Sequence, residues 1–444
     1  MIGVAVIGGG LAGLSAAWRL ARRGVDVHLF EAAGRVGGFV GTVKTPDGFL
    51  LERGPSSIRG GRSTIRLLVQ MLGLDGHIQD GRAAAKRRFI WARGRLIEVP
   101  SNPVALVKSP ILTPRGKLAL FSEPFVKARR DGAAETVAEL FARRIGREAV
   151  DNLIDPIVTG IFAGNPARLG TDAFPGLGEV EKKYGSFFGA LMKRGPAAMG
   201  GGGLYSFDEG LEILPATMGA ELGERVHHGR VADRLETIAG GVRVHFREGE
   251  AVEAREVIVA TPSLEVGRIL ADTPEARFLG AMPHPPIVRV EIGVKKADVA
   301  HALDGFGLLC ASTSPLPNGA GPVLGIVFAS SVFEGRAPAD HHAITVLLGG
   351  TRDPDADQRS DEALVTQACG ALTEVLGLRG APTMTLVTRW SRAIPQYQPG
   401  HAAAIAALKR ALPHGVQLAG NYLEGVSMDS AVATGLAAAD AVRV

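Results

Sequence analysis

The sequence predicts an α/β fold, α+β overall, built around a discontinuous Rossmann-like nucleotide-binding domain. Two observations lead to this prediction. Residues 3–31 contain a strand, a glycine-rich turn, a helix and a second strand that ends in an acidic residue. Apolar strands of the same character return near residues 255 and 416, after a helical stretch and a second group of strands. This order indicates a nucleotide-binding domain whose segments are separated by inserted units.

The glycine-rich turn has the spacing G-x-G-x-x-G and lies directly between strand and helix. Gly8 would allow the tight turn, Gly10 would leave the backbone open to a pyrophosphate, and Gly13 would let the helix lie close to the strand. Leu11 and Ala12 begin the helix, where unpaired N–H groups favour phosphate. These five residues are therefore predicted to bind a dinucleotide.

An acidic residue ends the second strand, at the place where such folds bind ribose. The Glu31 carboxylate would accept hydrogen bonds from a ribose hydroxyl, and its charge disfavours the 2′-phosphate of NADP. Ala32 follows it and is predicted to lie at the same end of the cofactor. No second G-x-G-x-x-G follows a strand in the sequence, which favours an oxidase over a pyridine-nucleotide reductase.

Length and composition limit the classes of protein. A chain of 444 residues is expected to form two or three structural units. The sequence has no apolar run long enough for a transmembrane helix and no signal-peptide pattern at its N-terminus. Its two cysteines, Cys310 and Cys369, lie far apart, which fits a reducing compartment. We therefore expect a cytoplasmic protein.

Charge and motif spacing exclude several kinds of site. The net charge is +4, and no basic motif with interleaved aromatic residues predicts nucleic-acid binding. An anionic lipid or an anionic substrate is compatible with this charge. The histidines are not at metal-ligand spacing with acidic residues, so no metal site is predicted. No catalytic dyad emerges either, as expected where a cofactor carries the chemistry.

The residues after Glu31 distinguish between cofactors. Arg35, Gly37 and Gly38 resemble the extended FAD fingerprint of the amine-oxidase-like flavoproteins. Arg35 is expected to reach the phosphates, and the two glycines would let the backbone pass close to the cofactor. The predicted cofactor is therefore FAD.

The whole chain resembles the oxygen-dependent protoporphyrinogen oxidases, which are FAD enzymes of haem biosynthesis. Several segments carry this resemblance, and they occur in the family's order. They are LERGPSSIR at 51–59, DPIVTGIFAGNPARLG at 155–170, YSFDEGLEILPATM at 205–218, AIPQYQPGH at 393–401 and GNYLEGVSMDSAVATG at 420–435.

The resemblance implies three domains, including a helical one that faces a membrane. The FAD-binding domain would comprise 1–85, 203–275 and 408–444, the mixed-sheet substrate-binding domain 86–98 and 276–407, and the helical domain 99–202. Peripheral contact with the inner face of the cell membrane is expected. Within the helical domain, Phe187, Phe188, Leu191 and Met192 beside Lys193 and Arg194 would suit this contact.

The resemblance also implies further site residues. Arg88 would bind the propionates and Phe89 would contact the ring, while Gly160 would present a backbone carbonyl to the reacting ring. Apolar residues on either side of the tetrapyrrole would be Phe306, Leu309 and Leu347. A helix from about Ser430 would direct its N-terminus at the flavin. The further cofactor-binding residues would be Gly54, Pro55, Ser56, Val231, Trp390, Gly420, Gly425, Val426 and Ser427.

The implied reaction is the six-electron oxidation of protoporphyrinogen IX to protoporphyrin IX. Three hydride transfers to FAD would be followed by electron transfer to O₂, with release of H₂O₂. A coproporphyrinogen III oxidase is an alternative, and its substrate carries four propionates instead of two. More distant alternatives are an amine oxidase or carotenoid desaturase relative and a non-catalytic flavin-binding protein. The resemblance also raises a homodimer and hand-over of the product to a metal chelatase, which the residues do not decide.

Overall fold

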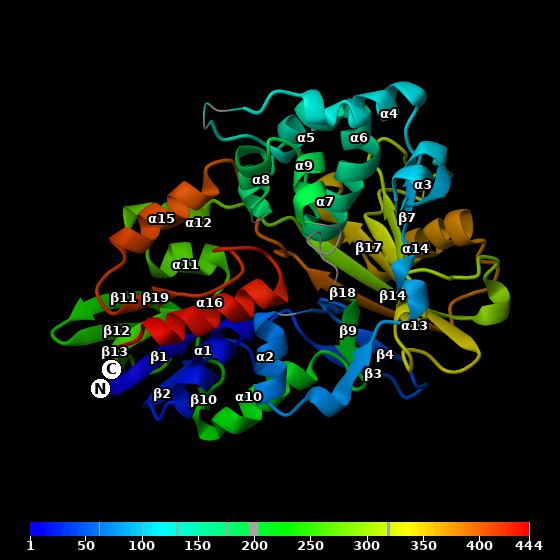
Figure 1. Ribbon diagram of the computed structural model, residues 1–444. Coiled ribbons are helices and arrows are strands. Elements are labelled where there is room, and N and C mark those ends of the chain that lie inside the picture. The colour runs from blue at the N-terminus through cyan, green and yellow to red at the C-terminus, as the bar shows by residue number, and fades with distance from the viewer. Residues whose placement is uncertain are drawn as a thin grey trace.

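The computed structural model describes residues 1–61, 63–100, 102–129, 131, 133–174, 176–194, 203–317 and 320–443. Two sheet-based units lie side by side, and a block of helices covers one end of both (Figure 1). The chain passes between these units several times, so each sheet contains strands from distant parts of the sequence.

The sheet of the first unit is mainly parallel and has β1 at its centre. β1 pairs with β2 on one side and β13 on the other, and β13 also pairs with β19, as the returning strands predict. β10 extends the parallel part beyond β2, and β12 and β11 extend it antiparallel from β13. The strands are β1 (Ile2–Ile7), β2 (Val27–Phe30), β10 (Val226–His227), β11 (Ala232–Ile238), β12 (Gly241–Phe246), β13 (Val252–Val259) and β19 (Val416–Leu418).

Helices bury both faces of this sheet, so its central strand is apolar on both sides. Val4 and Val6 face one hydrophobic core, and Ala5 and Ile7 face another. The first core contains side chains from α1 (Leu11–Arg22), α2 (Thr64–Met71), α10 (Ile213–Leu222) and α16 (Met428–Ala441). The second contains side chains from α11 (Ser263–Ile269), α12 (Arg277–Gly280) and α15 (His401–Ala411).

The second unit contains a mixed sheet with the strand order β18–β14–β17–β16–β15–β7–β8. β7 and β15 are parallel, and the other neighbours in this order are antiparallel. The helix α14 (Asp361–Leu376) buries one face, and α13 (Ala329–Val332) follows β16. The strands are β7 (Phe89–Ala92), β8 (Arg95–Glu98), β14 (Ile287–Lys295), β15 (Gly307–Cys310), β16 (Gly325–Val327), β17 (His341–Gly349) and β18 (Met384–Trp390).

Two small antiparallel sheets flank the first unit, and the sequence analysis did not predict either as a sheet. Their strands have three residues or so each, too few to give a clear alternation of apolar and polar residues. One pairs β3 (Thr42–Lys44) with β4 (Leu50–Glu52), and the other has the order β5 (Ile58–Arg59), β9 (Leu204–Phe207) and β6 (Ile78–Asp80).

The helical block begins with helices whose caps are visible in the sequence. The Thr113 hydroxyl accepts a hydrogen bond from the Gly116 N–H at 3.2 Å, and Pro114 is the first residue of the helix. Thr136 and Glu139 form a capping box. The elements are α3 (Pro103–Lys108), α4 (Pro114–Phe121), η3 (Glu123–Phe125), α5 (Val137–Ile145), α6 (Arg147–Ala149), the π-helical η4 (Val150–Ile154), α7 (Asp155–Phe162), α8 (Leu177–Tyr184) and α9 (Phe187–Arg194).

The helical block is held by buried charge rather than by apolar contacts alone. The Arg144 side chain is 1% exposed and contacts Glu123 and Glu181. Phe187 lies against this cluster, with its ring stacked on Phe141 at 5.3 Å and its face toward the Arg144 guanidinium. One side of the Phe187 ring therefore packs inward, and its contact with a membrane stays a prediction.

The other residues of that predicted membrane group give less information. The Phe188 ring lies 6.5 Å from that of Phe121. The side chains of Leu191 and Met192 are outside the described part of the structure. In the part of the chain that the structure describes, no helix has the length and apolar character needed to cross a bilayer.

Candidate active site

The glycine turn after β1 has the geometry that each of its glycines predicts. Gly8 has a φ of 105°, and a Cβ there would stand 2.7 Å from the Ala260 carbonyl oxygen. At Gly13 a Cβ would overlap the Gly8 carbonyl oxygen, so the helix needs glycine to approach the strand. At Gly10 a Cβ would meet no atom within 4 Å. The space beside Gly10 is therefore open, as the approach of a pyrophosphate requires.

A second glycine loop lies against the first. Gly37 pairs with Gly10 in a β-bridge, and its N–H donates to the Gly9 carbonyl at 2.7 Å. Gly38 has a φ of 56°, and a Cβ there would stand 3.2 Å from the Gly10 Cα. The two loops that the sequence predicts for the cofactor are thus brought together at Gly10.

Arg35 holds the second loop in shape. Its guanidinium donates to the carbonyls of Val36 and Val40, both at 3.0 Å, and to that of Gly38 at 2.9 Å. These contacts give Arg35 a structural role in the loop. The predicted contact of Arg35 with the phosphates stays a prediction.

The predicted adenosine residues are neighbours in space. The Glu31 carboxylate accepts hydrogen bonds from the Gly9 N–H at 2.5 Å and from the Ala33 N–H at 2.7 Å, so it lies beside the glycine turn. Ala32 lies between Glu31 and Ala33 in the sequence. The Arg230 N–H donates to the Glu31 carbonyl at 2.9 Å. Val231 follows Arg230, which places both predicted contacts at the same end of the sheet.

A buried hydroxyl without a partner lies beside the turn. Among the described residues the Thr261 Oγ1 finds no hydrogen-bond partner, and the Thr261 backbone nitrogen would stand 3.2 Å from a Cβ on Gly8. Thr261 follows β13, at the carboxyl edge where such sheets bind nucleotides. An unpaired buried hydroxyl at this position fits a bound phosphate or polyol. Sequence reasoning missed Thr261, because its only signal is a Thr-Pro pair after an apolar strand.

The C-terminal motif packs against the start of α1 from the other end of the chain. A Cβ at Gly435 would overlap the Ala12 carbonyl oxygen, so α16 packs directly on the start of α1. The Ser427 hydroxyl caps α16 by accepting from the Ser430 N–H at 3.1 Å. The helix therefore begins at Met428, two residues before the predicted start near Ser430, because Ser427 is the capping residue.

The loop before α16 contains the remaining predicted residues of this motif. Gly420 has a φ of 148°, and its N–H donates to the Thr434 hydroxyl at 3.0 Å. Gly425 has a φ of 126°, and the Val426 side chain packs against a core of the helical block. The loop thus runs between the nucleotide-binding unit and the helical block.

The predicted residues Gly54, Pro55 and Ser56 lie where the two sheet units meet. A Cβ at Gly54 would overlap the Phe39 carbonyl oxygen. The Phe39 ring lies 4.8 Å from that of Trp390 at the end of β18, and the Trp390 indole N–H donates to the Arg53 carbonyl at 2.7 Å. Trp390 is therefore brought to the same junction.

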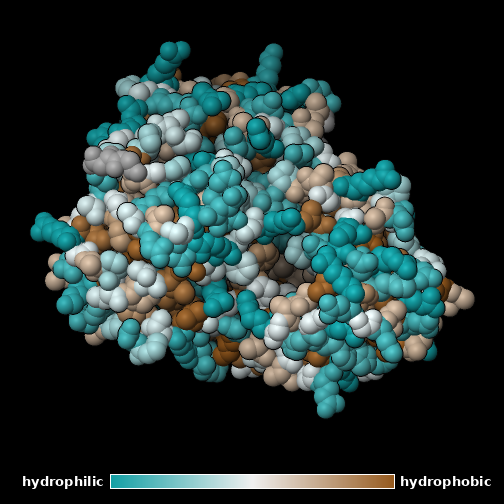
Figure 2. Space-filling model, turned by 180° about the vertical axis from the view of Figure 1, so that it is seen from behind, coloured by the Kyte–Doolittle hydropathy of each residue, from teal (hydrophilic) through white to brown (hydrophobic). Residues whose placement is uncertain are grey.

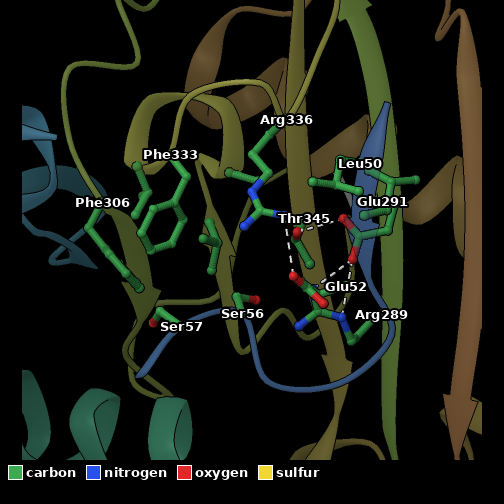
Figure 3. A pocket seen from close by; sticks show the side chains of 14 residues that line it. Leu50, Glu52, Ser56, Ser57, Arg289, Glu291, Phe306, Phe333, Arg336 and Thr345 are labelled. Carbon is green, nitrogen blue, oxygen red and sulfur yellow. Dashed lines mark hydrogen bonds and ion pairs between the residues drawn. The ribbon is translucent and has the colours of Figure 1, made fainter. Parts of the chain in front are cut away.

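A cavity of about 20 Å³ next to this junction is lined by residues of both units (Figure 3). This volume suffices for about one water molecule. Two ion pairs lie along it, Arg336 with Glu52 at 3.3 Å and Arg289 with Glu291 at 2.8 Å. The Thr345 hydroxyl donates to Glu291 at 2.6 Å. Ser56 and Ser57 face the same cavity, with Phe306 and Phe333 beside them (Figure 3).

The Glu52–Arg336 pair crosses from one unit to the other. Arg336 also donates to the Ser206 hydroxyl at 2.7 Å and the Phe207 carbonyl at 3.1 Å. Glu52 accepts from the Leu211 N–H at 2.9 Å. Burial raises the pKa of the Glu52 carboxyl, and the Arg336 guanidinium opposes this shift. The pair therefore joins the units close to the predicted cofactor loop.

Three of the predicted site residues lie together at the face of the mixed sheet opposite α14. Leu347 pairs with Gly325, and Gly325 pairs with Leu309, so the two leucines share one row with only a glycine between them. A Cβ at Gly160 would overlap the Leu309 side chain, which places α7 directly against this row. These residues form an apolar surface at the meeting point of sheet and helical block.

A cation lies at the edge of this surface. The Arg88 guanidinium stands 5.8 Å from the centre of the Phe306 ring, close enough for a cation–π contact. The neighbouring Arg87 is engaged by Glu98 at 2.8 Å and by Asp304. Among the described residues no carboxylate pairs with Arg88, which leaves its charge free for an anionic ligand.

The predicted ring contact of Phe89 is contradicted by its position. Phe89 pairs with Leu308, one residue before Leu309, and side chains alternate between faces along a strand. Its ring is 7% exposed, lies in the core under α14 and meets His301 at 5.8 Å. Phe89 therefore supports the sheet from the opposite face.

Comparison with known proteins identifies the family. A family model described as flavin containing amine oxidoreductase matches residues 11–443. The chain belongs to this flavoprotein family. Protoporphyrinogen oxidase 2 of Arabidopsis thaliana is 30% identical over 480 residues, which cover 99% of this chain and 93% of that protein. The coproporphyrinogen III oxidase of Bacillus subtilis is 26% identical and covers 98% of this chain and 96% of that protein.

A solved structure shows the same fold. A crystal structure from Exiguobacterium sp. 255-15 superposes with a TM-score of 0.86 at 23% identity, covering 99% of this chain and 98% of that one. Membership of the family makes the chain an FAD-dependent oxidoreductase, as predicted. The open side of Gly10 and the unpaired Thr261 hydroxyl fit this cofactor. In the described part of the chain, no group of three or more His, Cys, Asp or Glu side chains could hold a metal.

Proposed function

We propose that the protein oxidises a porphyrinogen, with protoporphyrinogen IX as substrate, protoporphyrin IX as product and O₂ as electron acceptor. The observation that carries the proposal is an apolar surface, formed by Leu309, Leu347 and Gly160, with the free cation Arg88 at its edge. A tetrapyrrole has the same distribution, with a flat apolar ring and propionates at one edge. Coproporphyrinogen III is the second candidate, because the Bacillus subtilis relative carries that name.

The residues of this chain have positioning roles in the proposal. Leu309 and Leu347 lie against the ring, and Arg88 holds a propionate at the edge where Phe306 supports its guanidinium. Gly160 lets α7 pack directly against Leu309, and this contact helps to exclude water from that end of the surface. FAD, when bound, supplies the acceptor for hydride and the route of electrons to O₂.

Anaerobic mixing tests the reaction directly. The purified, FAD-loaded protein is mixed with protoporphyrinogen IX without oxygen, and we expect the visible absorbance of the oxidised flavin to bleach. Flavin that stays oxidised with both porphyrinogens would overturn the proposal. The ratio of kcat/KM for protoporphyrinogen IX and coproporphyrinogen III decides between the two substrates.

Arg88→Ala is expected to raise the KM for the porphyrinogen while the protein keeps its FAD. Loss of one charge-assisted contact of about 1.5–3 kcal/mol corresponds to a roughly 10- to 100-fold loss in kcat/KM. The matched control is Arg95→Ala, an exposed arginine of the same hairpin, which should change kcat/KM little. Equal kinetics for both variants would rule out the propionate role of Arg88.

We also propose that the helical block docks on an anionic membrane surface, as a peripheral contact of a cytoplasmic protein. Exposed apolar side chains lie on α3, α4 and η3, with Val104 65%, Leu118 71% and Phe125 86% exposed. Exposed Lys108 and Lys127 lie on the same stretch of chain. The block forms the top of the molecule in both views (Figures 1 and 2). Apolar and basic residues together suit a headgroup layer.

Co-sedimentation with vesicles tests this surface. The double variant Leu118→Ser, Phe125→Ser should reduce binding to vesicles of mixed anionic and zwitterionic lipid. Leu67→Ser is the control, since Leu67 is 60% exposed on α2 in the other unit. Equal sedimentation of both variants and the wild type would contradict the docking proposal. A homodimer and hand-over of the product to a chelatase stay predictions of the family resemblance.

A further inference from the structure

A buried segment joins the loop before α16 to the helix that carries Gly160. This connecting segment, Ile394–His401, follows β18 and passes between the nucleotide-binding unit and the helical block. Three of its polar side chains are almost fully buried: Gln396 is 7%, Tyr397 1% and His401 6% exposed. Burying such groups is unfavourable unless they are hydrogen-bonded, so their partners indicate what the segment does.

Tyr397 holds the loop Gly420–Ser427, here called the flavin loop. The Tyr397 hydroxyl donates to the Asn421 carbonyl at 2.6 Å and accepts from the Gly425 N–H at 2.9 Å. The Tyr397 hydroxyl thus bridges the backbone of Asn421 and that of Gly425 within the flavin loop. Without it, the Gly425 N–H would be left buried and unpaired.

His401 strengthens this contact. Its imidazole lies parallel to the Tyr397 ring, with ring centres 3.8 Å apart. Its Nε2 stands 2.8 Å from the Tyr422 carbonyl oxygen, and since a carbonyl only accepts, Nε2 carries the proton. Tyr397 and His401 together therefore bind three backbone groups of the flavin loop.

Gln396, the residue before Tyr397, binds the C-terminal end of α7. The Gln396 side-chain amide donates to the carbonyl of Phe162, the last residue of α7, at 2.8 Å. A Cβ on Gly164 would overlap the Gln396 amide oxygen, so position 164, two residues after the end of α7, has room only for glycine. The Tyr397 carbonyl accepts from the Gly170 N–H at 2.7 Å. Adjacent residues of one segment thus bind the end of α7 and the flavin loop.

We propose that Tyr397 and Gln396 are positioning residues that fix the flavin loop relative to α7. Tyr397 determines the geometry of the loop that leads to the Ser427 cap of α16, and Gln396 determines the position of the helix turn that contains Gly160. In this proposal the segment sets the distance between the predicted cofactor loop and the helix turn that contains Gly160. This inference rests on the proposed function where it concerns the substrate, and its effect on the flavin rests on the predicted contact of the flavin loop with FAD.

The test uses the FAD-loaded full-length protein with Tyr397→Phe and a matched control. Tyr205→Phe is the control, since the Tyr205 hydroxyl is also buried but has no hydrogen-bond partner in the part of the chain that the structure describes. We expect Tyr397→Phe to retain FAD, to shift the flavin absorbance spectrum and midpoint potential, and to lower kcat about 10- to 100-fold with little change in KM. Tyr205→Phe should leave the FAD content, the spectrum, the potential, kcat and KM unchanged.

Gln396→Met separates the two contacts. It removes the bond to the end of α7 but not those to the flavin loop, so we expect a lower kcat/KM with an unchanged flavin spectrum. A wild-type spectrum and potential in Tyr397→Phe, or equal shifts in Tyr205→Phe, would overturn the proposal. Spectrum and potential are measured by photoreduction without porphyrinogen, so this arm remains decisive even if the wild type oxidises no porphyrinogen and the proposed function fails.

Discussion

Gly10→Ala is expected to remove FAD from the protein without destabilising the folded apoprotein. Gly10 has ordinary extended backbone angles and a Cβ there meets no protein atom within 4 Å, so alanine fits the empty site. The added methyl group would instead occupy the space that the pyrophosphate needs. The ratio of flavin to protein absorbance and the Tm of the apoprotein measure the two effects separately.

Gly13→Ala is expected to lower both the flavin content and the Tm of the apoprotein. Its Cβ would overlap the Gly8 carbonyl oxygen, so α1 must move away from β1, at a cost of about 1–3 kcal/mol typical of overpacking. Gly76→Ala is the control, because its Cβ meets nothing and Gly76 lies far from the turn in sequence. Full flavin occupancy in Gly10→Ala would show that the pyrophosphate does not approach this glycine.

The nucleotide site could be predicted from the sequence because its signals are local. Gly8, Gly10 and Gly13 have fixed spacing between a strand and a helix, and Glu31 ends the next strand. The return of β13 and β19 to the same sheet could be predicted from their apolar character, since parallel strands buried on both faces lack alternation.

The lack of alternation in buried strands also explains why the ring contact predicted for Phe89 is wrong. β7 is a continuous apolar run, Phe89–Ala92, and all four residues are buried. Alternation therefore does not reveal which residues face the site and which face α14. The parallel pairing of Phe89 with Leu308 decides the question, and this pairing joins segments more than 200 residues apart.

The contacts that join the units have no sequence signal. Glu52 and Arg336 are 284 positions apart, and each resembles any other charged residue of the chain. The Tyr397 hydroxyl and Gly425 form a similar contact between segments that look independent in the sequence. Such pairs depend on the relative placement of units, which periodicity and composition do not encode.

Arg144→Met is expected to lower the free energy of unfolding by about 3–5 kcal/mol, the usual effect of removing one partner of a buried ion pair. Arg144 and Glu123 are 1% and 0% exposed, and Arg144 also contacts Glu181 at 2.9 Å. Without the guanidinium, Glu123 would remain buried without its counter-charge. Urea unfolding monitored by circular dichroism measures the loss.

The loss should begin in the helical block and spare the cofactor site at first. Glu123 also accepts from the N–H groups of Phe187 and Phe188, at 2.9 and 3.2 Å, and so orders the start of α9. Limited proteolysis of Arg144→Met should therefore cut within 99–202 while FAD stays bound. The control is Arg147→Met, whose side chain is 73% exposed and pairs with Asp151 at 2.9 Å. An exposed pair of this kind contributes about 0.3–0.5 kcal/mol.

A second substitution distinguishes charge from packing. If the lost stability comes from the uncompensated carboxylate, adding Glu123→Gln to Arg144→Met should recover part of it, because the double variant buries one charge fewer. If the loss comes from the missing volume of the arginine stem, the double variant should be no more stable than Arg144→Met alone. Equal stability of Arg144→Met and Arg147→Met would show that the buried network does not stabilise the helical block.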